Sequence, residues 1–194
     1  MKTLNQYIKE KLIINKDYKD YSDTRIVVKT VNELRNIIED RYDKLGPGTK
    51  QDPIDFNDIN VSNIYSFYNN DNKYKGLFEG RNFKYIDISS WDVSNVRSMY
   101  HMFYGCIELK SIGDITKWDV SNVSDMLAMF YWCKSFNQDI SSWDVSNVTD
   151  MSYMFYECKS FNQDLSRWNV YKVADRSGMF YDCPIKEEYK PKFK

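Results

Sequence analysis

The 194-residue chain lacks any long hydrophobic run. None of its apolar stretches approaches the roughly 20 residues that a transmembrane helix requires. The first residues, Met-Lys-Thr-Leu-Asn-Gln, also lack the apolar segment of a signal peptide. The sequence therefore predicts a protein without a membrane span or a signal peptide. We expect a cytoplasmic location or, as the alternative, association with a larger particle such as a virion.

An excess of either charge is also missing. Lys and Arg together number 27, Asp and Glu together number 28, and the formal net charge is −1. Proteins that bind nucleic acids usually carry a basic surface that neutralises phosphates, so we expect no nucleic-acid partner. With 42% hydrophobic residues, the chain has enough apolar side chains for the core of one domain.

Residues for acid–base, nucleophilic and zinc chemistry are scarce. His101 is the only histidine, and the four cysteines show no Cys-x-x-Cys spacing. A hydrolytic triad or a histidine-ligated zinc site would have to use His101, whose place in the repeat described below predicts a variable surface position. We therefore expect no enzyme activity and no catalytic, metal-binding or cofactor-binding residues.

What the sequence has instead is a repeat of about 25 residues. Four tryptophans and four cysteines recur at the same intervals, and Asp-Val-Ser-Asn-Val or a variant follows each tryptophan; a degenerate earlier copy begins at Ile59. One repeat cannot bury its own apolar face, so about five coils should stack, with the tryptophans half-buried at one corner. The tryptophans are Trp91, Trp118, Trp143 and Trp168, and the cysteines are Cys106, Cys133, Cys158 and Cys183.

Each coil is predicted to contain one strand and one short helix. Met151, Met154, Phe155 and Cys158 lie at i, i+3, i+4 and i+7, which is the spacing of one helix face. Residues 136–141, Phe-Asn-Gln-Asp-Ile-Ser, have the character of a strand. Stacking would place successive strands in a parallel sheet about 4.8 Å apart. The expected fold class is therefore α/β, a short right-handed solenoid of about five coils.

The run Met-Phe-Tyr-x-Cys-x-x-Phe-Asn-Gln-Asp-Leu-Ser-x-Trp-Asp-Val-Ser-Asn-Val-x-Asp-Met carries a resemblance to a known family. It is similar to the repeat of BspA-like bacterial surface proteins, a divergent leucine-rich-type repeat long catalogued as a domain of unknown function. The resemblance covers about residues 59–183 and implies a leucine-rich-repeat-like solenoid with recognition surfaces, often on cell-surface proteins. It implies no catalytic residues.

A strand–helix cap is predicted at residues 24–58, before the repeats. Residues 25–29 have the character of a strand, and Thr30-Val31-Asn32-Glu33 fits a capping box that opens a helix. Gly46-Pro47-Gly48 should end this helix. Such a cap would cover the apolar edge of the first coil.

The tail, residues 184–194, is predicted to cap the other end of the repeats. Its charged residues suit an edge at which the stack must not continue. We expect Tyr189 or Phe193 to cover the last coil.

Residues 1–23 are predicted to form a separate amphipathic helix and a linker. The segment Leu-Asn-Gln-Tyr-Ile-Lys-Glu-Lys-Leu-Ile-Ile-Asn-Lys is similar to an N-terminal peptide on proteins of large tailed bacteriophages of gut bacteria. The helix either packs on its own domain or anchors the chain in a larger assembly such as a virion, and both alternatives are open. The candidate anchor residues are Leu4, Tyr7, Ile8 and Leu12.

The cysteines are predicted to be buried, reduced and structural. Each occupies the apolar face of its coil, and stacked helices usually stand about 8–10 Å apart, which is too far for a disulfide. A small and weakly polar thiol suits a crowded interior.

Aspartates form two columns, one before the apolar residue of each predicted strand and one after each tryptophan. Carboxylates one coil apart repel each other, so we expect them to accept hydrogen bonds from turn N–H groups. Calcium binding is the alternative, although the sequence has no glycine-rich aspartate loop. The columns are Asp87, Asp114, Asp139 and Asp164, and Asp92, Asp119 and Asp144.

Aromatic residues beside each Met-Phe pair form the candidate protein-binding surface. Tyrosine columns either pack between coils or form an interface, since interface cores are enriched in Tyr and Trp. The sequence thus predicts a non-enzymatic protein–protein interaction module, with a structural component of a larger assembly as the alternative. The candidate surface residues are Tyr104, Tyr131, Trp132, Tyr153, Tyr156 and Tyr181.

Overall fold

The computed structural model describes residues 25–69 and 75–193 of the chain. The fold of this part is mixed α/β, with one α-helix, short strands and a 3-10 helix, η1 (Glu187–Tyr189). The predicted anchor helix, with Leu4, Tyr7, Ile8 and Leu12, lies outside the described residues. Within them, no helix has the length and apolar character needed to cross a membrane.

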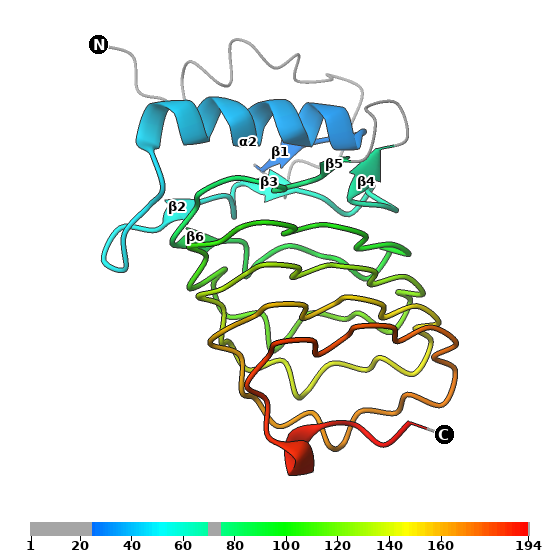
Figure 1. Ribbon diagram of the computed structural model, residues 1–194. Helices are drawn as coiled ribbons and strands as arrows, with labels where there is room; N and C mark the ends of the chain where they lie inside the picture. The colour runs from blue at the N-terminus through cyan, green and yellow to red at the C-terminus, as the bar shows by residue number, and fades with distance from the viewer. Residues whose placement is uncertain (1–24, 70–74, 194) are drawn as a thin grey trace, which may run out of the picture.

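Helix α2 (Val31–Leu45) covers one end of the repeat segments (Figure 1). Thr30 caps its first turn by accepting a hydrogen bond from the Glu33 N–H at 3.2 Å. At the other end Gly46, with φ of 73°, donates its N–H to the Tyr42 carbonyl. The predicted start and end of this helix are confirmed, and Leu34 and Ile38 are fully buried against the first repeat.

Two short parallel pairings join the cap to the repeats. Strand β1 (Ile26–Val27) pairs with β3 (Ile59–Asn60), and β2 (Ile54–Asp55) pairs with β6 (Ile86–Asp87). Arg41 of α2 strengthens this junction, because its guanidinium donates to both carboxylate oxygens of Asp58 at 2.7 Å. Strand β4 (Tyr68–Asn69) pairs antiparallel with β5 (Lys75–Gly76).

The repeat segments lie one above another, as Figure 1 shows below α2. Equivalent residues of successive segments, Ser98, Asp125, Asp150 and Asp175, are joined by parallel bridges. Every second N–H donates to the next segment: Tyr153 to the Ser177 carbonyl at 2.9 Å, and Glu157 to the Tyr181 carbonyl at 2.8 Å. The N–H groups between them close tight turns three residues back along the same segment.

The predicted short helices are wrong, because α2 is the only α-helix within residues 25–69 and 75–193. An α-helix requires each N–H to bond within its own segment, whereas here every second N–H bonds to the neighbouring segment. Positive φ angles at Tyr153 (57°) and Glu157 (54°) also break a right-handed helix. The four predicted apolar positions are nevertheless all buried. The described residues therefore confirm the predicted α/β class, but their repeats do not consist of one strand and one helix each.

The predicted strand at residues 136–141 is also absent. In this part of the repeats, side-chain amides rather than backbone groups form hydrogen bonds to the backbone of the neighbouring repeat. The Gln138 amide accepts the Ile112 N–H and donates to the Gly113 carbonyl, each at 2.7 Å. The Gln163 amide donates to the Asn137 carbonyl at 3.0 Å. Parallel pairing consequently stays confined to two-residue strands and isolated bridges in the described residues.

The core is a row of aromatic side chains stacked along the repeats. Consecutive rings of one phenylalanine column lie 5.1–5.8 Å apart and nearly parallel. These phenylalanines are Phe78, Phe103, Phe130, Phe155 and Phe180. The four repeat tryptophans are only 3–5% exposed, so the prediction that they are half-buried is wrong.

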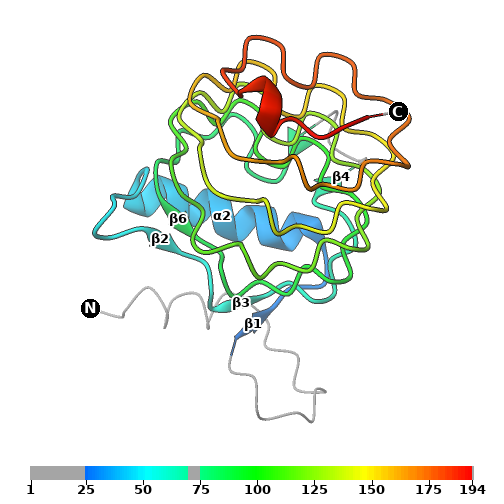
Figure 2. The same cartoon turned by 90° about the horizontal axis from the view of Figure 1, so that it is seen from below.

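The tail crosses the far end of the repeats, as Figure 2 shows from below. The Leu165 N–H donates to the Tyr189 carbonyl at 2.8 Å, and Ile185 is buried. Tyr189 and Phe193 both pack against the core. Tyr189 or Phe193 was predicted to cover the last repeat, and both residues do so.

The tryptophans provide a matched test of the packing. The Trp143 Nε1–H donates to the Ile115 carbonyl at 3.0 Å, whereas the buried Trp118 Nε1 has no hydrogen-bond partner in the described residues. Trp143→Phe and Trp118→Phe remove the same volume, but only the first removes a hydrogen bond. We expect Trp143→Phe to lower the free energy of unfolding by about 1 kcal/mol more than Trp118→Phe, measured by urea denaturation. Equal losses would contradict this account.

Candidate functional site

Four of the predicted surface tyrosines form one continuous stack, here called the tyrosine column: Tyr104, Tyr131, Tyr156 and Tyr181. Their ring centroids are 4.6, 4.7 and 4.7 Å apart, and neighbouring rings are tilted by 2°, 6° and 11°. The column arises because each tyrosine directly follows an inward phenylalanine of the core. Ring faces are thus used for packing between repeats, and the ring edges are available to solvent.

The other two predicted residues, Trp132 and Tyr153, flank the column. Trp132 lies 5.5 Å from the Tyr131 ring, and Tyr153 lies 5.9 Å from the Tyr156 ring. Trp132 is 40% exposed and Tyr153 is 42% exposed. The structure therefore brings all six predicted residues together on one side of the repeats, here called the tyrosine face. Their participation in binding stays a prediction.

Unusual backbone angles present the two flanking side chains. Trp132 has φ of 59° and Tyr153 has φ of 57°, both in the left-handed region. Glycine occupies the equivalent positions in neighbouring repeats, at Gly105 and Gly178. A side chain on Gly178 would meet the Tyr153 ring at 2.7 Å. The glycine thus leaves room for Tyr153 to lie over the last repeat.

Stacking also changes the acidity of the column. Burial raises the pKa of Tyr131, and the adjacent Tyr104 hydroxyl raises it further. Burial likewise raises the pKa of Tyr156, and the neighbouring Tyr131 and Tyr181 raise it further. The hydroxyls of these residues stay protonated at neutral pH, so the column offers a row of neutral groups that both donate and accept hydrogen bonds.

His101 extends the aromatic surface at its N-terminal end, which sequence reasoning missed. Its ring lies 3.9 Å from the Tyr100 ring and 4.5 Å from the Tyr104 ring, stacked on both. Its Nδ1 lies 3.7 Å from a carboxylate oxygen of Glu79. The repeat alignment predicted a surface position for His101, but its side chain is only 15% exposed, so this prediction is wrong. The alignment also gave no sign of the stacking, which occurs at a residue with a positive φ of 54°.

The four cysteines are free thiols; Cys106, Cys133 and Cys158 are buried as predicted, whereas Cys183 is only partly buried. The Cys133 thiol donates to the Phe103 carbonyl at 3.0 Å, and the Cys158 thiol donates to the Phe130 carbonyl at 2.9 Å. Burial raises the pKa of the Cys106 thiol to about 12. The thiols act as weak donors between repeats, in agreement with the predicted structural role.

The aspartates of the two columns accept hydrogen bonds from the residue two positions later. Asp114 accepts the Thr116 hydroxyl at 2.7 Å and the Thr116 N–H at 3.1 Å. Asp119 accepts both groups of Ser121 in the same way. This confirms the predicted turn hydrogen bonds. In the described residues, no group of three His, Cys, Asp or Glu side chains is arranged to hold a metal ion.

These turns predict how stability depends on pH. The Thr116 hydroxyl, followed by its N–H, lowers the pKa of Asp114 below its usual value of 3.8, and the serine two positions later does the same for Asp139, Asp144 and Asp164. A carboxyl group whose pKa is lower in the folded chain than in the unfolded chain stabilises the fold. This stabilisation is complete at pH values above the pKa of the group in the unfolded chain, and it is lost as the pH falls through the pKa in the folded chain. The free energy of unfolding should therefore decrease as the pH is lowered below about 4.

Thr116→Val tests one such turn, because it removes the hydroxyl and keeps the N–H. We expect the pKa of Asp114 to rise and the acid-induced loss of stability to become smaller. An NMR titration of the Asp114 carboxyl, with Asp164 as an internal reference, measures the shift. An unchanged Asp114 pKa would show that the hydroxyl has no such effect.

Comparison with known proteins identifies the family. Neither the curated proteins nor the solved structures compared with the chain include a match. The sequence model of one family, described as Mycoplasma protein of unknown function, DUF285, matches residues 72–191. This range includes the tyrosine face and excludes α2, and it supports the predicted repeat family of unknown function. Because the match covers more than half of the sequence, the chain belongs to the DUF285 family.

Proposed function

We propose that the chain is a non-enzymatic protein–protein interaction module whose tyrosine face binds another protein. In this proposal the repeat segments form a short solenoid of about five coils of the BspA-like class. The observation that carries the proposal is the exposure of Trp132, Tyr153 and Tyr181, at 40%, 42% and 59%, beside a packed aromatic column. Tyr and Trp are the side chains in which interface cores are enriched.

Rigidity supports this use of the face. A side chain that is mobile before binding loses rotamer freedom when it is immobilised, which costs about 0.5–1.5 kcal/mol each. Tyr131 is already held between Tyr104 and Tyr156, so this cost is small for it. The column would act as a fixed platform, and Trp132 and Tyr153 would supply the main contacts.

The charge around the face indicates a partner with mixed polar and apolar character. The Lys134 ammonium lies 5.8 Å from the centre of the Trp132 ring. Lys159 forms ion pairs with Glu157 and Asp182 close to the C-terminal end of the column. Charges of both signs surround the aromatic residues, so long-range attraction to a strongly charged partner is not expected.

Replacing Trp132 and Tyr153 by asparagine tests the face without removing the column. Asparagine tolerates positive φ better than most residues. The free energy of unfolding of Trp132→Asn/Tyr153→Asn should therefore lie within about 1 kcal/mol of the wild-type value. Partner capture should be lost. Tyr65→Asn is the matched control, since Tyr65 is 63% exposed outside the tyrosine face.

The measurement is affinity capture from extracts of the source cells with all three proteins as baits. Proteins held by the wild type and by Tyr65→Asn, but not by the double variant, would identify the partner. If the double variant folds normally and retains the same proteins, the tyrosine face is not the binding surface. Tyr131→Asn is unsuitable as a probe because it removes stacking on both sides and destabilises the repeats.

The alternative, a structural component of a larger assembly such as a virion, rests on the phage-like sequence of the first residues. Deleting residues 1–14 separates the two proposals. An assembly anchor predicts that the shortened chain keeps its Tm and is lost from purified assemblies. A helix packed on its own domain predicts a lower Tm instead, measured by differential scanning calorimetry.

A further inference from the structure

The hydrogen-bond ladder between repeats ends with unused donors. In the three repeats before the last one, the alternate N–H groups donate forward, as Phe155 does to the Met179 carbonyl at 2.9 Å. Four N–H groups of the last repeat are equivalent to these donors, and three of them belong to Gly178, Phe180 and Asp182. None of these three has an acceptor within the described residues. They belong to the same positions that donate forward in the three preceding repeats, so they face the end of the stack.

Two ring stacks end at the same place. Phe180 stacks on Phe155 at 5.7 Å with a tilt of 1°, and Tyr181 stacks on Tyr156 at 4.7 Å with a tilt of 11°. Both residues are the last members of their columns. Tyr181 is 59% exposed, which leaves one face of its ring open to a further planar group.

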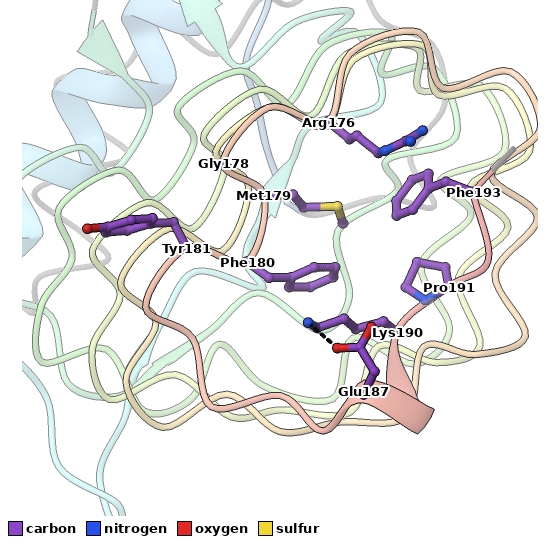
Figure 3. Close-up of a pocket in the computed structure, with 9 residues that line it drawn as sticks. All are labelled: Arg176, Gly178, Met179, Phe180, Tyr181, Glu187, Lys190, Pro191 and Phe193. Atoms are coloured by element: carbon purple, nitrogen blue, oxygen red, sulfur yellow. Dashed lines mark hydrogen bonds and ion pairs between the residues drawn. The ribbon is translucent and has the colours of Figure 1, made fainter.

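A groove of about 450 Å³ lies between the last repeat and the tail (Figure 3). Met179 and Phe180 form one wall, and Pro191 and Phe193 of the tail form the other. The Arg176 guanidinium lies 4.7 Å from the centre of the Phe193 ring, which holds the tail in place. Lys190 is paired with Glu187 at 2.6 Å, and Arg176 adds a further positive charge to the lining of the groove.

We propose that this end of the molecule binds an extended peptide segment of another protein, and that the segment continues the ladder as a further repeat would. Its carbonyl groups accept hydrogen bonds from Gly178, Phe180 and Asp182. A Phe-Tyr pair of the segment stacks on Phe180 and Tyr181 and displaces the Lys190 ammonium, which lies 5.9 Å from the centre of the Phe180 ring. This is strand addition at an open backbone edge. The site shares Tyr181 with the tyrosine face, and Gly178 adjoins the Tyr153 ring. The other members of the site lie outside the tyrosine face.

The chemistry of the end favours such a segment over a second copy of this chain. The ladder edge of the last repeat offers donors, so two copies meeting end to end would place donor against donor. The opposite end of the repeats, where a second copy would have to present acceptors, is covered by α2 (Figure 1). The occupant must therefore be an acceptor-rich extended chain with aromatic side chains.

A peptide with the sequence of residues 148–158, carrying Cys158→Ser, is the probe. Hydrogen exchange followed by NMR should show rapid exchange of the Gly178, Phe180 and Asp182 amides in the free chain. Saturating peptide should slow their exchange about tenfold or more, with little change at Tyr153, Phe155 and Glu157, which are already bonded. A peptide with its phenylalanine and tyrosines replaced by serine is the control and should give no protection.

Three outcomes would overturn the proposal: slow exchange of these amides in dilute free chain, no protection at saturating peptide, or protection that grows with protein concentration in the absence of peptide. The last would assign the site to a second copy. Trp132→Asn, which leaves Tyr153 in place against Gly178, should bind the probe as the wild type does. Failure of the tyrosine-face proposal and failure of this one are therefore distinguishable.

Discussion

The alternate backbone hydrogen bonds between consecutive repeats are the constraint on which the structure depends. Phe103 donates to the Met129 carbonyl, Phe130 to the Met154 carbonyl and Phe155 to the Met179 carbonyl, at 2.9–3.0 Å. Each bond fixes the register between equivalent residues, so identical side chains stand directly over each other. Aromatic rings then stack, whereas identical charges would repel. The aspartate columns are tolerated because each carboxylate accepts donors from its own turn.

Burial was predictable from the sequence, but the backbone conformation of the repeats was not. The positions of Met151, Met154, Phe155 and Cys158 were predicted to face inward, and all are buried. Their spacing fits an α-helix, and it equally fits a chain that turns every few residues. The choice between them depends on whether N–H groups bond within a segment or to the next one, which is a tertiary effect. Helix α2 was predictable because its signals, Thr30 and Gly46, are local.

The same distinction applies to the candidate site. The tyrosine column was predictable because each of its tyrosines directly follows an inward phenylalanine at the same position of the repeat. The stacking of His101 on Tyr100 and Tyr104 could not be predicted, because it requires a positive φ at a residue other than glycine. The groove at the C-terminal end depends on the path of the tail across the last repeat, for which the sequence contains no periodic signal.

Positive φ angles recur at the same two positions of successive repeats and belong to the repeat backbone. His101 and Ala128 share the position of Tyr153, and Glu157 and Asp182 share the position of Trp132. A non-glycine residue in the left-handed region costs roughly 1–2 kcal/mol, and Gly105 and Gly178 show that glycine fits there. Trp132 and Tyr153 nevertheless occupy such positions and expose about 40% of their surface. Burial in the core therefore cannot fully account for these bulky side chains. The lateral hydrogen bonds hold the unfavourable backbone angles in place, and the result is two aromatic groups held outward beside a rigid column.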